Sequence, residues 1–415
     1  MTRGGIKRYH YFKLLFATII VSLASVFLAL SLKELTEHFQ ELIFHTTQKT
    51  NTLFFLILPS IGITAIYFLR KYLFKKRRNK GIMEIYKTID QRKEHLPLYK
   101  IPSHYLNGFL TVIFGGSTGI EVSTVVATAT IGNHAYKNKT AARSYKLELI
   151  CAGVAAGIAI LFNSPIGGML FSLEVIARKV NRSLLIACIT AALISFGTLY
   201  FYQPARILSF PVNTWQWSAL PFFLLLSLMS GLLSVYFTRL VIVIKRFFSG
   251  INNNFIRVNL GAVFVGTLIL FLPFLYGDSY GGVANVLTNP QEFPILLLLL
   301  LAVLKPIASA VTLGAGGDGG VFAPSIVAGA FLGVALALFC NVYFDTSFIY
   351  LNFALVGAAA TLSASIYAPL TSLFLVCNIV PNGFNLFVPI LLCAWIAKVF
   401  AKKILPYNVY TYQGR

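Results

Sequence analysis

The sequence carries little charge, and few of its charges are negative. Only 11% of the 415 residues are charged, whereas a typical soluble domain has about 25%. Acidic residues number 13, against 34 lysines and arginines. A water-exposed surface needs a dense cover of charged side chains, so this composition excludes an ordinary soluble protein.

Cysteine is scarce as well. The five cysteines all lie in apolar stretches, and none stands at the spacing of a zinc or redox motif. They are Cys151, Cys188, Cys340, Cys377 and Cys393. The pattern predicts small buried residues, and we expect neither a metal site nor a cofactor.

Long apolar runs fill the sequence instead. The mean hydropathy is +0.77, and several runs are long enough to cross about 30 Å of hydrocarbon. They occupy residues 14–32, 52–69, 183–201, 218–237, 260–275 and 384–400. We therefore predict an all-α polytopic membrane protein embedded in a lipid bilayer.

The excess of basic residues fits that prediction. On a soluble protein it would suggest a nucleic-acid partner, but in a membrane protein Lys and Arg gather in cytoplasmic loops. Basic residues precede the first apolar run at Arg3, Lys7 and Arg8 and recur in 70–100 and 398–403. The first run is too long for a signal peptide and lacks a cleavage site. We expect an integral protein of the plasma (inner) membrane, with both termini cytoplasmic and no nucleic-acid partner.

Residues 115–119 read GGSTG, which matches the G-x-S-x-G nucleophile elbow of hydrolases. That elbow joins a strand to a helix in a soluble α/β sheet, and no such sheet can be written here. No histidine stands near Ser117 in a triad-like context. The sequence thus predicts that the protein is not an enzyme, with a membrane-embedded serine hydrolase as a remote alternative.

The chain is similar to itself at an offset of 201 residues. EVSTVVATATIG at 121–132 falls on FAPSIVAGAFLG at 322–333, and both segments follow a glycine-rich loop. An offset of 204 then aligns GVAAGIAILFNSP with GAAATLSASIYAP. We predict two homologous halves, roughly 1–205 and 206–415, folded as the single transmembrane domain 1–415.

Glycine-rich loops before short helices of small residues have a specific meaning inside a bilayer. Broken backbone is tolerated there only where it lines a cavity or is buried in protein, and interruptions at corresponding places of two halves mark a substrate site. The first N–H groups of a helix carry partial positive charge, so converging helix starts bind an anion. Close helix packing is the alternative reason for such glycines, but it explains the loop GAGGDGG poorly.

These loops resemble those of the CLC family of chloride channels and proton-coupled chloride transporters. GIEVS at 119–123 stands in register with the family's G-[KR]-E-G-P motif, and GVFAP at 320–324 matches its G-x-F-x-P motif. FNSPIGGMLFSLEV matches the FN-x-P segment, NKGIM loosely matches the G-S-G-I-P loop, and Tyr410 matches the C-terminal tyrosine. The resemblance covers nearly the whole chain. It implies a CLC-like fold with two inverted-topology repeats and broken or re-entrant helices.

The resemblance also implies a site and an assembly. Glu121 corresponds to the gating glutamate, which would occupy the anion's own place until protonation releases it. The alternative role is a stabilising acid in the first helical turn. The implied anion-binding residues are Lys80, Gly81, Ile82, Gly320, Val321, Phe322, Ala323 and Tyr410. A homodimer with one pore per subunit and a bacterial-type chain without the cytoplasmic CBS tail are implied as well.

Several positions depart from the family pattern. Lys80 stands where the family has an anion-coordinating serine. Its charge either attracts anions or, as we prefer, belongs to the basic loop and reaches water. Ile120 replaces a basic residue and Ser123 a proline, changes that bear on conduction and gating more than on the fold. Asp318 is unexpected near an anion path, and either caps a helix or faces an aqueous vestibule.

The last departure concerns protons. In CLC exchangers, the residue after the glutamate of the LFxxE segment is a second glutamate that takes protons from the cytoplasm. Here that residue is Val175, directly after Glu174. Valine cannot bind a proton, so this inner proton site is lost. The sequence therefore favours passive or weakly proton-coupled, channel-like transport of chloride or similar anions, with a proton-coupled chloride or fluoride antiporter as the alternative.

Overall fold

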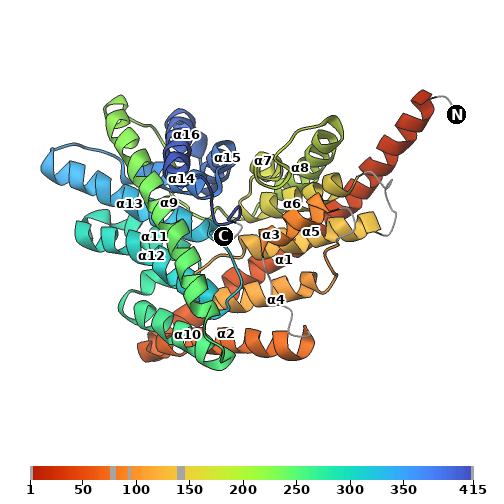
Figure 1. Cartoon of the computed structure of the whole chain (residues 1–415). Helices are drawn as coiled ribbons and strands as arrows, with labels where there is room; N and C mark the ends of the chain where they lie inside the picture. The colour runs from red at the N-terminus through yellow and green to blue at the C-terminus, as the bar shows by residue number, and fades with distance from the viewer. Residues whose placement is uncertain (1–2, 75–80, 92–94, 138–144, 413–415) are drawn as a thin grey trace. The chain divides into compact units, whose positions relative to one another are not determined.

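The apolar runs fold into helices in the computed structural model, which describes residues 3–74, 81–91, 95–137 and 145–412 (Figure 1). Across these ranges the structure contains sixteen α-helices and no β-strand. Their bounds are α1 (Arg3–Thr50), α2 (Leu58–Phe68), α3 (Ile82–Asp90), α4 (Lys100–Ile113), α5 (Glu121–Lys137), α6 (Lys146–Leu161), α7 (Pro165–Phe171), α8 (Arg182–Tyr202), α9 (Leu220–Ser249), α10 (Asn254–Phe271), α11 (Tyr280–Thr288), α12 (Ile295–Ala315), α13 (Phe322–Tyr343), α14 (Tyr350–Ile366), α15 (Pro369–Ile379) and α16 (Phe387–Ile404).

Eight helical segments of the described chain are long and apolar enough to cross a membrane. They are His10–Thr50, Thr52–Leu73, Arg182–Tyr202, Trp217–Ser249, Asn254–Phe271, Ile295–Ala315, Phe322–Tyr343 and Gly383–Ile404. Other apolar helices, such as Pro165–Ala177 and Pro369–Ile379, are too short to span a bilayer. The prediction of an all-α polytopic membrane protein with broken helices is confirmed.

Local sequence explains where several of these helices begin. α7 and α15 each start on a proline, whose missing N–H costs nothing at the first helical position. Ser164 caps α7 by accepting a hydrogen bond from the N–H of Gly167 at 3.2 Å. Asn181 caps α8 in the same way, through the N–H of Leu184 at 2.7 Å.

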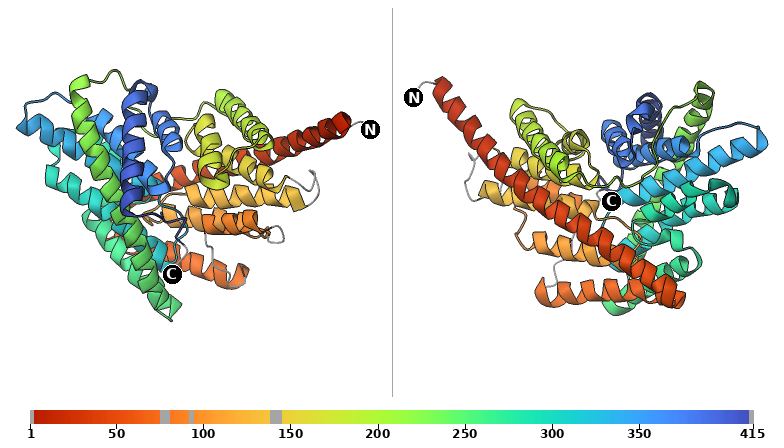
Figure 2. Two further views of the ribbon diagram at one scale, coloured as in Figure 1. Left: turned by 45° about the horizontal axis from the view of Figure 1, so that its top comes forward. Right: turned by 180° about the vertical axis from the view of Figure 1, so that it is seen from behind.

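The chain forms two compact units. The first comprises residues 1–34, 78–106 and 121–205, and the second comprises 35–77, 107–120 and 206–415. α1 runs without a break through the chain segment at which the first unit gives way to the second (Figure 2). Segment 107–120 of the second unit therefore lies in the sequence between two segments of the first.

Small residues make up the buried helices of each unit. In the first unit, Ala152, Ala155 and Ala156 of α6 pack with apolar residues of α1 and α8. In the second unit, α13 and α14 are buried along almost their whole length. Such helices can approach closely because glycine and alanine let the backbones meet.

Gly333 of α13 lies at one of the closest backbone contacts. A Cβ added to Gly333 would lie 2.0 Å from the carbonyl oxygen of Phe353 in α14. Backbone atoms cannot move aside cheaply, so the helices would have to separate. We expect Gly333→Ala to destabilise the fold by about 1–3 kcal/mol, the usual cost of overpacking.

The thermal unfolding midpoint of the detergent-purified protein measures this effect. Gly197→Ala in α8 is the matched control, because nothing lies within 4 Å of a Cβ built there. Alanine is also the better helix former, so this variant should unfold at the wild-type temperature or slightly above. Equal midpoints for the two variants would contradict the packing argument.

Candidate functional site

The two glycine-rich loops singled out in the sequence pair with each other in the second unit. Gly119 and Gly320 form an isolated antiparallel bridge. The hydroxyl of Thr118 donates to the carbonyl of Gly320 at 2.8 Å and accepts from the N–H of the same residue at 3.0 Å. A Cβ at Gly319, whose φ is +153°, would lie 2.5 Å from the Thr118 hydroxyl, so glycine is required there.

Two threonines fix these loops through reciprocal hydrogen bonds. Thr312 of α12 accepts the N–H of Ser117 at 3.1 Å, and Thr111 of α4 accepts the N–H of Asp318 at 2.9 Å. Each threonine hydroxyl also donates to a carbonyl four residues earlier in its own helix. Because every one of these groups is buried, the hydrogen bonds hold both loops in one conformation.

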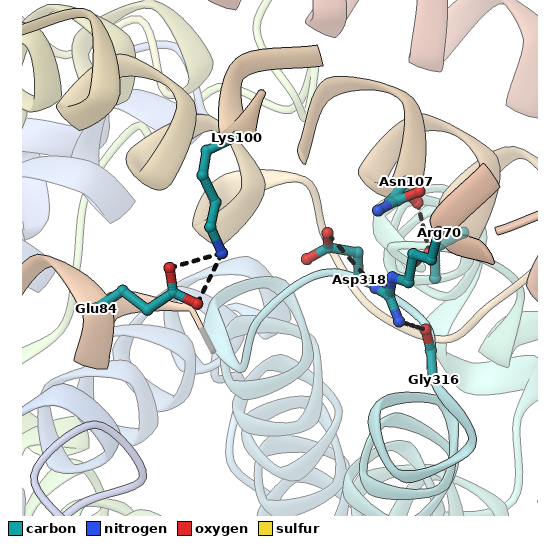
Figure 3. A network of polar contacts seen from close by, with 7 residues as sticks. Arg70, Glu84, Lys100, Asn107, Gly316 and Asp318 are labelled. Atoms are coloured by element: carbon teal, nitrogen blue, oxygen red, sulfur yellow. Dashed lines mark hydrogen bonds and ion pairs between the residues drawn. The ribbon is translucent and has the colours of Figure 1, made fainter. Parts of the chain in front are cut away.

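Asp318 is buried and ion-paired. Its carboxylate lies 3.8 Å from the guanidinium of Arg70, which also donates to the carbonyl of Gly316 at 2.8 Å (Figure 3). The helix that follows starts at Phe322, with Val321 at the N-cap position and no side-chain cap. Only 6% of the Asp318 side chain is exposed, and its roles as a helix cap or as a residue of an aqueous vestibule both stay predictions.

The start of α13 gathers most of the predicted anion-binding residues. Gly320 and Val321 precede it, and Phe322 and Ala323 are its first residues, fully buried. The ring of Tyr410 lies 6.1 Å from that of Phe322, centroid to centroid. The second unit therefore brings these five residues together, and their role in anion binding stays a prediction.

The first unit contains the other predicted residues. Glu121 is the first residue of α5 and is buried, with 4% exposure. Gly81, with φ +63°, precedes α3, and a Cβ there would contact Val122 of α5 at 3.5 Å. The starts of α3, at Ile82, and α5 are thus neighbours. Lys80 lies outside the described residues.

An ion pair that the sequence did not indicate lies near the start of α3. Glu84, in the first turn of α3, pairs with the ammonium of Lys100 at 2.6 Å (Figure 3). Lys100 is almost fully buried. The pairing compensates a negative charge that would otherwise oppose an anion at this helix start.

The segment around the lost inner proton site is π-helical. Residues Ser172–Ala177 continue α7 as a π-helix, a form often found at functional sites. The phenol of Tyr86 donates to the carbonyl of Val175 at 3.0 Å, and the guanidinium of Arg178 lies 3.8 Å from the centre of the Tyr86 ring. Glu174 stands in the middle of this segment and is partly exposed.

Ser117 is not placed to act as a nucleophile. It is fully buried, and its hydroxyl accepts a hydrogen bond from the ammonium of Lys305 at 2.8 Å. Lys305 also donates to the carbonyl of Gly277 and the hydroxyl of Ser279. These contacts hold Ser117 inside the protein, where it has no exposed surface to offer a substrate.

Comparison with known proteins gives the family. The family model described as "Voltage gated chloride channel" matches residues 61–402. The H(+)/Cl(-) exchange transporter ClcA of Vibrio cholerae serotype O1 is 28% identical over 362 residues, which is 83% of this chain and 75% of that protein. These relatives are transporters rather than enzymes.

Solved structures show the same fold. A slow cyanobacterial Cl-/H+ antiporter superimposes with a TM-score of 0.81 over 96% of both chains at 22% identity. A CLC-type fluoride/proton antiporter superimposes with a TM-score of 0.80 over 99% of this chain and 98% of the other, also at 22% identity. With the CLC-like fold confirmed, the chain belongs to the voltage gated chloride channel family.

Proposed function

We propose that this protein exchanges chloride or a similar small anion for protons across a membrane. The observation that carries the proposal is that a curated relative and two solved neighbours are named as proton-coupled exchangers or antiporters. This chain covers three quarters or more of the length of each of these proteins. The comparisons thus favour the antiporter alternative over the channel-like transport that Val175 suggested.

The helix starts supply the anion-binding chemistry. The positive end of α13 lies at residues 320–323, and Val321 at the N-cap position has no side-chain oxygen. Backbone N–H groups at such an end bind an anion without a full cationic charge. Within the second unit, Tyr410 would add its phenol. In the first unit, Gly81 and Ile82 at the start of α3 would offer backbone N–H groups of the same kind.

Glu121 is the group proposed to couple anion and proton. Its carboxylate stands at the start of α5, where a helix end favours negative charge. A buried carboxylate that competes with the anion leaves the anion's place when it is protonated. The binding of one proton to Glu121 is then coupled to the binding of one anion. The alternative role of Glu121 is that of an acid that stabilises the first turn of α5.

Because Val175 cannot bind a proton, an exchanger needs another group to accept protons at the inner end of the proton path. Glu174 is the acid adjacent to that position, and it is partly exposed in the π-helical segment Ser172–Ala177. π-helical turns are frequent at functional sites. We propose Glu174 as the inner proton acceptor.

The hydrogen bonds of the second unit support the predicted repeat. Thr111 and Thr312 are related by the offset of 201 residues, as are Ser117 and Asp318 and the bridged glycines 119 and 320. The hydrogen bond from Ser117 to Thr312 thus recurs between the counterparts of these two residues, Asp318 and Thr111, as a twofold axis requires. We propose two inverted-topology halves within one transmembrane domain.

We also propose a homodimer with one pore per subunit. The protein would lie in the plasma membrane with both termini in the cytoplasm.

Purified protein in liposomes tests the function. An imposed chloride gradient, with the membrane potential clamped by valinomycin and potassium, should drive protons uphill and change the internal pH. The proton movement should reverse when the gradient is reversed. Chloride flux without proton movement would favour the channel, and faster exchange of fluoride than chloride would favour the fluoride antiporter.

A further inference from the structure

Lys305 is a buried cation to which the proposed function has given no role. It is the only charged residue of α12, and its side chain has no exposed surface. Its ammonium donates to the hydroxyl of Ser117 at 2.8 Å, the carbonyl of Gly277 at 2.8 Å and the hydroxyl of Ser279 at 2.7 Å. A charge inside a membrane protein is costly and by default indicates function.

One face of α12 fixes residue 117 at both of its polar groups. Lys305 holds the Ser117 side chain, and Thr312 accepts the Ser117 N–H at 3.1 Å. Lys305 and Thr312 are seven residues apart, so they lie two helical turns apart on the same side of α12. Ser117 therefore can neither rotate nor shift along the helix without breaking a buried hydrogen bond.

The segment held in this way leads directly into α5. Thr118, the next residue, is tied to Gly320, and the chain then reaches Glu121 at the helix start. The other two acceptors of Lys305 belong to the loop before α11, which contains no residue of the proposed site. Asp278 in that loop accepts from Gln40 and from the N–H of Tyr280, both at 3.1 Å.

We propose that Lys305 is a positioning residue of the exchange reaction, acting through Ser117 to fix the direction in which the chain enters α5 at Glu121. The proposal rests on the coupling role proposed for Glu121. Lys305 itself touches neither the anion nor the proton. Its charge serves to make the hydrogen bond to Ser117 strong, since bonds to a charged group exceed those between neutral groups.

Two alanine variants separate positioning from mere stabilisation. Ser117→Ala and Ser279→Ala each remove one hydroxyl acceptor from the same ammonium, but only Ser117 lies on the segment that leads to Glu121. We expect Ser117→Ala to lower chloride turnover or the proton-to-chloride ratio by roughly fivefold or more, because small displacements of a reacting group are costly. Ser279→Ala should stay within about twofold of wild type on both measures.

Both variants are assayed in liposomes at matched amounts of protein that elutes as a single species. Equal effects of the two substitutions, or none from Ser117→Ala, would overturn the inference. Lys305→Arg should retain more of the proton-to-chloride ratio than Lys305→Met, because arginine keeps the charge. Chloride turnover is measured in the same vesicles. A wild-type protein that moves no protons would overturn the proposed exchange. The difference in chloride turnover between the two alanine variants would still decide the inference on Lys305.

Discussion

Replacing Glu121 by glutamine is expected to abolish proton movement while chloride continues to flow. Glutamine has nearly the shape of a protonated glutamate and cannot release a proton, so it would leave the anion's place open at every pH. Wild-type flux should rise as the pH falls from about 7 to about 4, the range in which exposed and buried carboxyl groups titrate. The Glu121→Gln variant should lose most of this dependence and stay near the acid level of flux.

The measurement is chloride efflux from liposomes at several pH values, with the internal pH recorded in parallel. Glu292→Gln is a suitable control, because Glu292 is an exposed acid whose carboxylate accepts a hydrogen bond from Asn289. It should leave both readings unchanged. A pH dependence that persists in Glu121→Gln would assign Glu121 the role of a first-turn stabilising acid instead.

Replacing Glu174 by glutamine should separate the two transported ions in a different way. Without an inner acceptor, protons cannot reach Glu121 from that side, whereas the anion path is untouched. We expect the proton-to-chloride ratio to fall by at least about a hundredfold, the lower end of the usual effect of losing a proton-transfer group. Chloride flux should persist and keep its pH dependence, since Glu121 still titrates from the other side.

Glu148→Gln provides the matched control for this variant. Glu148 is a buried acid of the first unit, and its carboxylate accepts a hydrogen bond from the hydroxyl of Ser183 at 2.6 Å, a hydrogen bond that glutamine can also accept. Unchanged proton coupling in Glu174→Gln would rule out Glu174 as the inner acceptor. The exchanger would then use a further group, and the proposed function itself would stand.

Much of the fold could be predicted from the sequence because it depends on local patterns. The starts of α5 at Glu121 and α13 at Phe322 follow directly from glycine loops that precede runs of small residues. Helix lengths were less accessible. The run 14–32 predicted one span, whereas α1 extends from Arg3 to Thr50, because its polar last turns are helical without being apolar.

The polar contacts of the site could not be predicted in the same way. Arg70 lies in a basic segment that reads as an ordinary cytoplasmic charge run, yet it pairs with Asp318 almost 250 positions away. No local pattern in the sequence predicts such a pairing. Lys305 did leave a signal, as a lone charge within the apolar segment 295–315, and the internal offset already related Thr111 to Thr312.

The pairing of the two glycine loops has a consequence for the order in which the protein is made. Segment 107–120 emerges early from the ribosome, but its hydrogen-bond partners in α12 and in loop 316–320 are synthesised about 200 residues later. At about 5–20 residues per second this interval lasts roughly 10–40 s. Backbone groups cannot remain without partners in lipid. The nascent chain must therefore keep the GGSTG loop in water or against the translocation machinery until the second half arrives.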